Sequence, residues 1–205
     1  MRLITFLSLL LLAVASGPGA DAADYEDVLI RDVPHARQKP DFCGEACAEM
    51  WLRKLGKKLN QDDVFDQSRL DPLEGRGCRT PELAAALTRL GLKVGRVRHA
   101  VRPEQAEADM EACWRGLYDD LRQGVPSIVC MRYEAEGSEH FRLVLGYRRR
   151  DDSVVYHEPA VGSGSYVSMK RAKFLDLWPL KYASDKWTVI RLRLDAGRIA
   201  EVKRT

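Results

Sequence analysis

The residues around Cys43 have the types and spacing that a nucleophilic thiol requires. Cys43 falls where a loop gives way to a helical pattern, so its sulfur is expected at a helix N-terminus. The positive end of the helix dipole and the free backbone N–H groups there favour a thiolate. Gly44 directly after the cysteine lets other groups approach the sulfur closely, and Gln38 lies in the entering loop. The segment predicts a reactive cysteine with a side-chain donor nearby.

A nucleophilic thiol also needs a base, and His140 is the candidate. It opens an apolar run that is typical of a strand. Histidine has the pKa that general-base catalysis near neutral pH requires. Glu158 ends the next expected strand, and antiparallel neighbours bring the start of one strand beside the end of the other. We therefore expect His140 and Glu158 to meet, with a core histidine at a strand start as the alternative.

The other three histidines lack such a setting. His35 lies in the entering loop and is expected to be exposed, and His99 follows a short strand without a nearby acid. His157 precedes Glu158 on a strand, where successive side chains point to opposite faces, so it is expected to face away from the site.

Three segments of the chain together resemble a known family. They read Gln38-x-x-x-x-Cys-Gly-x-Ala-Cys, His140-Phe-x-x-Val-Leu-Gly-Tyr and Val155-Tyr-x-Glu-Pro-Ala. This set is similar to that of the bacteriocin-processing (double-glycine) leader peptidase domain, which belongs to the papain-like cysteine proteases. The resemblance covers residues 30–195, nearly the whole chain after its first segment.

The resemblance implies a fold and a role for each residue. The fold would be the papain-like α+β fold, with N-terminal helices packed on an antiparallel sheet. Cys43 would be the nucleophile and His140 its base, while Gln38 and the backbone N–H of Cys43 would hold the oxyanion. Glu158 stands where the family usually orients its histidine with an Asp. The chain thus departs from the family pattern at the acid.

The reaction that follows is hydrolysis of a peptide bond through an acyl-enzyme. A Cys43 thiolate would attack the carbonyl carbon, and protonated His140 would give its proton to the leaving amine. The expected partner is a peptide or protein substrate. Two alternatives stay open: a papain-like amidase or transferase of the cell envelope, and a catalytically inactive module that binds peptides.

Residues 1–22 have the pattern of a cleavable signal peptide. Arg2 gives a short basic region, residues 3–14 form an apolar stretch too short to span a bilayer comfortably, and residues 20–22 (Ala-Asp-Ala) form a small-x-small cleavage site. We therefore expect a secreted or periplasmic protein whose mature part, residues 23–205, is a single domain. No later stretch of the sequence is apolar and long enough to cross a membrane.

The charges are numerous but balanced. Charged residues make up 31% of the chain and the formal net charge is +3. The run Arg148-Arg149-Arg150 is followed at once by two aspartates, as in a solvated turn. Because the positive charge is small and interspersed with acids, no nucleic-acid partner is expected. The sequence does not indicate an oligomeric state.

The five cysteines leave an odd number for an exported chain. This count suits one reactive thiol, Cys43, with up to two disulfides among Cys47, Cys78, Cys113 and Cys130, and the sequence does not choose their pairing. No Cys/His clusters with the spacing of metal ligands occur in the sequence, so we expect neither a metal nor a cofactor.

The remaining pattern predicts the elements that position these residues. Helices are expected over residues 44–55, 60–67, 80–90, 103–123 and 168–178. Strands are expected over residues 92–98, 127–133, 140–148, 153–157 and 186–194. Helices followed by an antiparallel sheet indicate an α+β layout in two layers.

Overall fold

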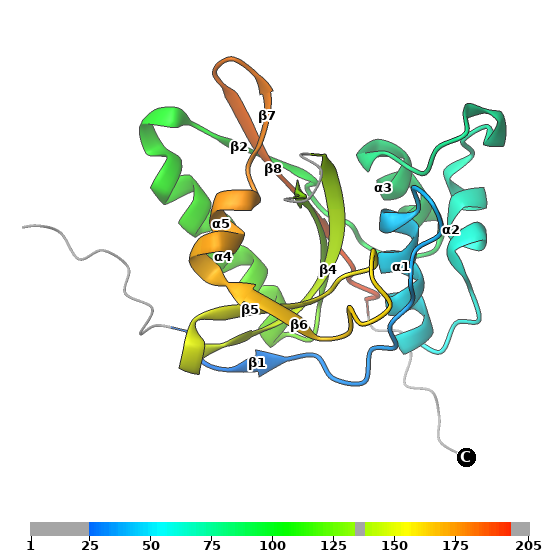
Figure 1. The fold of residues 1–205 in the computed structure, drawn as a ribbon, viewed down its shortest axis with the longest axis horizontal. Helices are drawn as coiled ribbons and strands as arrows, with labels where there is room; N and C mark the ends of the chain where they lie inside the picture. Colours follow the sequence, from blue (N-terminus) through cyan, green and yellow to red (C-terminus); the bar gives the residue numbers. More distant parts are fainter. Residues whose placement is uncertain (1–24, 134–137, 198–205) are drawn as a thin grey trace, which may run out of the picture.

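The computed structural model describes residues 25–133 and 138–197, which form helices around an antiparallel sheet (Figure 1). The helices are α1 Cys43–Lys54, α2 Gln61–Ser68, α3 Thr80–Arg89, α4 Ala106–Arg122 and α5 Arg171–Leu177, with short 3-10 turns at Pro72–Glu74, Pro103–Gln105 and Arg149–Asp151. The strands are β1 Val28–Leu29, β2 Arg98–Val101, β3 Ser127–Arg132, β4 Glu139–Arg148, β5 Ser153–His157, β6 Val167–Lys170, β7 Leu180–Ala183 and β8 Lys186–Arg193. Helices and antiparallel strands are thus arranged as the expected α+β class requires.

The described strands form one sheet in the order β2-β8-β3-β4-β5-β6, with β1 paired to β4 and β7 paired to β8. The longest strand, β4, carries His140 and is buried along nearly its whole length. A strand that is covered on both faces reads as a continuous apolar run rather than an alternating one. This is the reason that residues 141–147 contain only one charged side chain.

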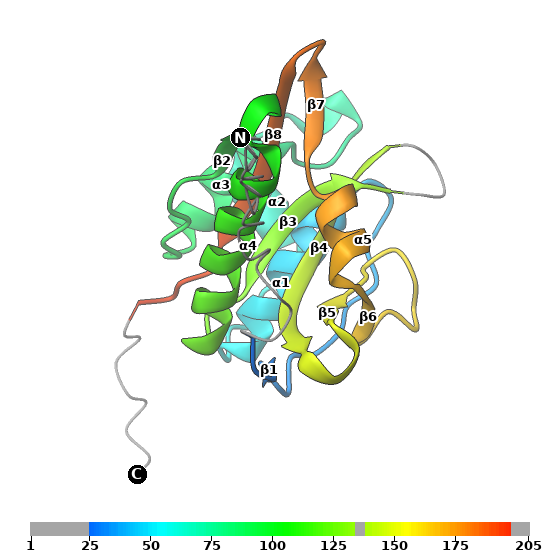
Figure 2. The same cartoon turned by 90° about the vertical axis from the view of Figure 1, so that its left-hand side faces the viewer.

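Helices cover both faces of the sheet, so the expected two-layer arrangement is wrong in this respect. Helices α1–α3 form one core with inward residues of β3, β4 and β8, among them Ile128, Leu143 and Ile190. Helices α4 and α5 form a second core on the opposite face, where Val129 and Val144 point. Figures 1 and 2 show these two helical groups on either side of the sheet. Because α1–α3 already cover one face of the sheet, the apolar stripe of α4 packs on the other face.

Two expected elements differ in the structure. Of the strand expected over residues 92–98, residues 92–97 hold only an isolated bridge between Lys93 and Asp195, and β2 starts at Arg98, where it pairs with Ile190 of β8. The helix expected over 168–178 is split: residues 167–170 pair with β5 as β6, and α5 begins only at Arg171. Pairing with the exposed edge of β5 satisfies backbone groups that a longer helix would leave open on that strand.

Candidate active site

Cys43 is the first residue of α1, at a helix end without a side-chain cap. Phe42 occupies the N-cap position and makes no side-chain hydrogen bond to the helix. The backbone N–H groups of the first turn therefore stay available to the sulfur or to a ligand. Gly44 allows this helix end to approach the sheet, because a Cβ at this position would lie 2.6 Å from a Leu83 methyl and 3.2 Å from the Phe141 ring.

The thiol of Cys43 is half-buried and forms no disulfide. Burial raises its pKa to about 11, and the charge of Glu45 acts in the same direction. Hydrogen bonds from the backbone N–H groups of Phe141, Gly44 and Cys43 itself oppose this shift without cancelling it. The direction of this shift is opposite to the one expected for a thiol at a helix N-terminus, because desolvation outweighs the backbone donors.

His140 and Glu158 meet as their strands predict. The Nε2 atom of His140 donates a hydrogen bond to Oε1 of Glu158 at 2.5 Å, and both residues are buried. In the β4–β5 register Leu143 pairs with His157, so Glu158 lies nearly opposite residue 142 and reaches His140 along the diagonal. Diagonal neighbours across an antiparallel pair are within reach of long side chains only. The extra methylene of Glu fits this path.

Glu158 is an ionised carboxylate with three hydrogen-bond donors. Burial alone would raise its pKa, but the hydrogen bond and charge of His140, the N–H of Ala160 and the charge of Arg142 together lower the pKa to about 2. Ala160 donates its N–H to Oε1 at 3.0 Å, and Arg142 Nε donates to Oε2 at 2.7 Å. A carboxylate held in this way keeps the His140 ring in one tautomer and leaves Nδ1 free of the acid.

Arg142 is a member of the site that the sequence reasoning missed. Its side chain is buried, and its guanidinium lies over the rings of Tyr133 and Tyr156 at 5.4 and 5.5 Å. The Nη1 atom is buried without a hydrogen-bond partner among the described residues. An arginine inside the apolar run after His140 was the available signal, because a buried guanidinium requires an anion nearby.

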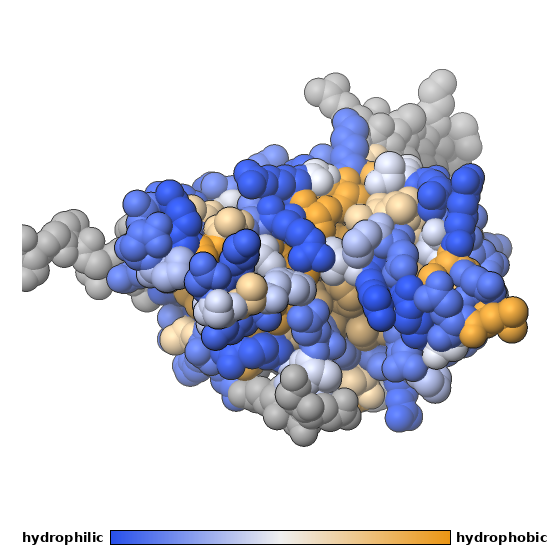
Figure 3. All heavy atoms as spheres, turned by 90° about the horizontal axis from the view of Figure 1, so that it is seen from above, coloured by the Kyte–Doolittle hydropathy of each residue, from blue (hydrophilic) through white to orange (hydrophobic). Residues whose placement is uncertain are grey.

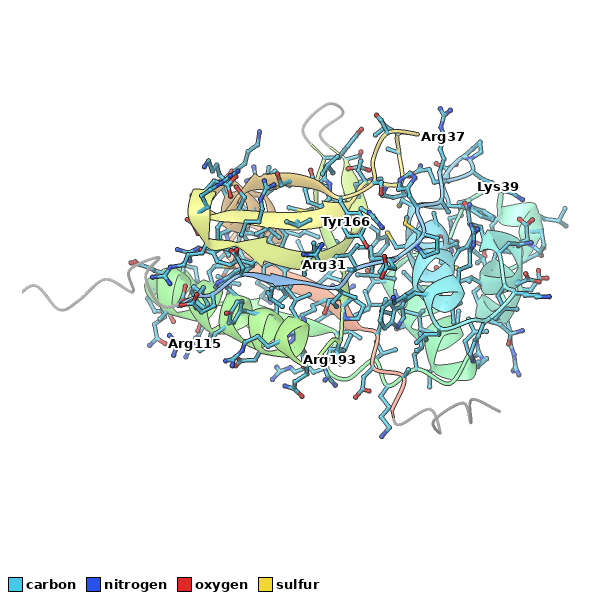
Figure 4. All side chains as sticks on the ribbon, turned by 90° about the horizontal axis from the view of Figure 1, so that it is seen from below. Arg31, Arg37, Lys39, Arg115, Tyr166 and Arg193 are labelled. Carbon is cyan, nitrogen blue, oxygen red and sulfur yellow. The ribbon has the colours of Figure 1, made fainter. Side chains whose placement is uncertain are left out.

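The loop that carries Glu158 is tied to the segment that precedes α1. His35 Nε2 donates to the carbonyl of Glu158 at 2.9 Å, and Gln38 N–H donates to the carbonyl of Pro159 at 2.9 Å. His35 is therefore partly buried rather than exposed as expected. Figure 4 shows this segment from Arg31 to Lys39, running from the sheet towards α1 and α2.

His157 faces away from His140, as expected, and supports the same segment. Its Nε2 donates to the carbonyl of Val33 at 3.0 Å, while its Nδ1 accepts the N–H of Tyr166 at 2.9 Å. The Tyr166 hydroxyl, labelled in Figure 4, accepts the N–H of Val33 at 2.9 Å. The fourth histidine, His99, lies on β2 away from these residues.

Gln38 lies near the acid loop through its backbone, and its side chain is unbound. The Oε1 atom is buried without a partner, and the amide nitrogen forms no hydrogen bond with the described residues. No hydrogen bond joins Cys43 to His140 within residues 25–133 and 138–197. The structure thus brings His140 and Glu158 together and places Gln38 beside their loop, but among the described residues it shows no hydrogen bond between Cys43 and His140.

The cysteines form no disulfide: all five are free, so the up to two disulfides allowed above are not present. Cys47 is buried one turn after Cys43 and its thiol donates to the carbonyl of Phe141 at 3.7 Å. Among the described residues no group of three or more His, Cys, Asp or Glu side chains is placed to hold a metal ion. In the same part of the chain, no helix combines the length and apolar character that a bilayer crossing requires.

Comparison with known proteins places this geometry in context. A family model described as the peptidase C39-like family matches residues 30–184. No curated protein matches the chain significantly.

Two solved structures share the fold. A Bacillus anthracis protein described as a C39-like peptidase superposes with a TM-score of 0.53 at 18% identity, covering 80% of this chain and 98% of its own. The peptidase domain of Streptococcus ComA, a bifunctional ABC transporter involved in a quorum-sensing pathway, gives 0.51 at 14% identity, with 80% and 99% coverage. At these identities the likeness concerns the fold alone, which is the α+β fold expected of papain-like peptidases.

Proposed function

The chain belongs to the peptidase C39-like family, and from this premise we propose that it is a cysteine peptidase with Cys43 as nucleophile and His140 as base. The observation that carries the proposal is the buried His140–Glu158 pair, held with its carboxylate ionised. A pair of this kind on the strand whose Phe141 N–H serves the Cys43 thiol has the parts of an acyl-transfer site.

The proposed mechanism starts from a neutral thiol. As Sγ of Cys43 bonds to the substrate carbonyl carbon, Nδ1 of His140 takes the thiol proton, in the manner of general-base catalysis. Substrate binding must close the gap between the two, since catalytic hydrogen bonds are often formed only in the complex. Glu158 stabilises the resulting imidazolium. The oxyanion is held by the backbone N–H of Cys43 and the amide of Gln38.

The remaining steps restore the enzyme. The imidazolium gives its proton to the leaving amine as the C–N bond breaks, which leaves a thioester on Cys43. His140 then takes a proton from water, whose oxygen attacks the thioester carbonyl, and the C–S bond breaks to release the acid. Arg142 moves no proton. It holds Glu158 in place through its Nε bond.

A substrate-like electrophile tests this proposal. A peptidyl epoxide should label Cys43 rapidly at neutral pH, and His140→Gln and Gln38→Ala should each slow the labelling by ~10²-fold or more. Iodoacetamide, which needs only the thiolate, should react slowly with Cys43 in all three proteins. Cys113 is also half-buried and serves as the matched control thiol. The readout is mass-spectrometric localisation of each label.

A catalytically inactive peptide-binding module is the second candidate. It is favoured by the missing Cys43–His140 hydrogen bond and by the burial that raises the pKa of Cys43 to about 11. In that case the epoxide would label Cys43 no faster than Cys113, while peptides would still bind. An amidase or transferase of the cell envelope would label like a peptidase but spare ordinary peptides in a substrate panel.

We also propose export through cleavage of residues 1–22, which lie outside the described residues. The support is the sequence pattern of that segment. Expression of the full chain in a bacterial host should give a mature protein that begins at Ala23, measured by intact mass of the secreted or periplasmic fraction. An uncleaved chain in the cell pellet would contradict export.

A further inference from the structure

A pocket of about 420 Å³ lies beside Cys43, between the sheet and the helices α1 and α3. Its wall includes the cysteine itself, Phe141 behind it, Arg79 and Thr80 at the start of α3, Arg98 on β2 and Tyr182 on β7. Figure 3 shows the molecule from above, with patches of apolar surface between hydrophilic side chains. A volume of this size accommodates a side chain with part of its backbone, so a residue of a bound substrate can enter it.

Two arginines in the wall make no ion pair with a carboxylate of the described residues. Arg79 and Arg98 are exposed, and neither forms an ion pair with a described residue. Arg98 lies over the Tyr182 ring at 5.1 Å, which holds its guanidinium at the pocket edge. Arginine recognises carboxylates through paired N–H groups, and a guanidinium held in position loses less freedom on binding one. Both arginines are therefore available to a ligand.

The acids near the pocket do not cancel this charge. Glu82 accepts the N–H of Arg79 and is paired with Arg76 through two bonds of 2.8 Å. Glu45 lies buried beneath and accepts the N–H of Cys78 at 2.6 Å. Only Glu139 lines the pocket, where it accepts the thiol proton of Cys130 at 3.9 Å. Among the described lining residues, two cationic side chains face one carboxylate, which makes this part of the wall positive.

We propose that this pocket binds a carboxylate of the substrate, so that the peptidase prefers an acidic residue beside the bond it cleaves. The inference rests on the proposed peptidase function, because Cys43 marks the position of the scissile bond. Arg79 and Arg98 would bind the carboxylate, and the positive end of α3, whose Thr80 is in the wall, would add to its stabilisation. The carboxylate can belong to an acidic side chain or to the C-terminus of the peptide.

Matched peptides measure the preference through turnover. In one set of peptides, the residue directly before or directly after the scissile bond is Glu or Gln. Each peptide is made with a free and with an amidated C-terminus. We expect a higher kcat/KM for Glu at one position. Arg79→Gln and Arg98→Gln should each lower the Glu/Gln ratio by about two- to five-fold, the range of exposed ion pairs. A preference that is lost on amidation assigns the carboxylate to the C-terminus.

Arg122→Gln provides the matched control. Arg122 is exposed at the end of α4 and does not line the pocket, and its removal changes the net charge equally. The Glu/Gln ratio should not change in this variant. Equal rates for Glu and Gln at every position, or a ratio that Arg79→Gln and Arg98→Gln leave unchanged, would overturn the inference.

Alkylation of Cys43 gives a second readout that needs no turnover. Iodoacetate carries a carboxylate where iodoacetamide carries an amide. The measured quantity is the rate of alkylation of Cys43 by iodoacetate divided by the rate with iodoacetamide, and free cysteine gives the reference ratio. Both rates are measured at pH about 9, where some thiolate is present. Arg98→Gln should lower the ratio about two- to five-fold, and Arg122→Gln should not. A lowered ratio without any peptide cleavage would refute the peptidase function and keep the anion pocket. Peptide cleavage without a preference for Glu, and with an alkylation ratio that Arg98→Gln leaves unchanged, would refute the anion pocket and keep the peptidase function.

Discussion

At the scale of single residues, the acid of the site has two partners that make different demands on its length. Arg142 lies nearly opposite Glu158 across β4 and β5, and its Nε bond of 2.7 Å needs no long reach. His140 lies one step along the diagonal and is reached at 2.5 Å. A carboxylate that serves both must therefore extend along the strand as well as across it.

Glu158→Asp should separate the two contacts. The shorter side chain can still pair with Arg142 but falls short of His140, so we expect kcat/KM to fall by ~10-fold or more. Stability should also fall, because His140 is the main group that lowers the Glu158 pKa, but by less than in Glu158→Gln, which also leaves Arg142 without an anion. The measurement is turnover together with urea unfolding of the same variant. Full activity of Glu158→Asp would mean that the strands shift to restore the His140 contact.

Glu158→Gln should cost stability as well as activity, because it leaves the Arg142 guanidinium buried without an anion. Removing one partner of a buried pair costs about 3–5 kcal/mol. The double variant Arg142→Met, Glu158→Gln should recover much of the free energy of unfolding and none of the activity. If the single and double variants unfold alike, the Arg142–Glu158 pair is not the stabilising contact.

The low pKa of Glu158 predicts acid sensitivity. Its pKa is about 2 in the folded chain against an ordinary value of 4.5. The stabilisation is therefore complete above pH 4.5 and is lost as pH falls towards 2, by up to about 3 kcal/mol. Glu45 acts with the opposite sign, because burial raises its pKa. Urea unfolding between pH 6 and 2.5 should show this loss, and Glu158→Gln should reduce it.

At the scale of elements, the approach of α1 to the sheet decides where the thiol lies. The helix has no side-chain cap, and its second residue is a glycine in contact with α3 and β4. The helical period around Cys43 was readable from the sequence, as were α2, α3 and most of α4. The sequence did not predict β6 or β7, because short edge strands are defined by their pairing partners more than by their own pattern.

Gly44→Ala tests this approach. A Cβ 2.6 Å from a Leu83 methyl forces α1 or Leu83 to move, so we expect a loss of about 1–3 kcal/mol. Gly116→Ala is the control, since this helical glycine on α4 has only the Arg191 Nη1 atom at 3.4 Å. It should be neutral or stabilising by up to about 1 kcal/mol. The midpoint of thermal unfolding measures both, and equal midpoints would contradict a tight contact at Gly44.

At the scale of the whole molecule, two cores share one sheet and the site lies at the edge of one of them. The order of helices and strands predicted the His140–Glu158 contact, because antiparallel topology alone brings strand ends together. It could not predict the direction of the pKa shift of the Cys43 thiol, since desolvation depends on how deeply α1 packs. Nor could it predict Arg142 as a partner of Glu158, because the strand register decides which residues lie opposite each other.

The number of free thiols in the whole chain can be measured. Denaturation without a reductant, followed by alkylation with iodoacetamide, should add five carbamidomethyl groups per chain, since all five cysteines are free. Intact mass measures the count. Three groups or one would show that disulfides form in the native protein.

The ties between the segment before α1 and the loop after β5 have a consequence for synthesis. His35 and Val33 bond to Glu158 and His157, partners 123 and 124 residues further along the chain. The first part of the chain to emerge therefore waits for one of the last before either is fixed. While the polypeptide is being made, Cys43 is present before His140 and Glu158, so the site that we propose cannot assemble in an incomplete chain.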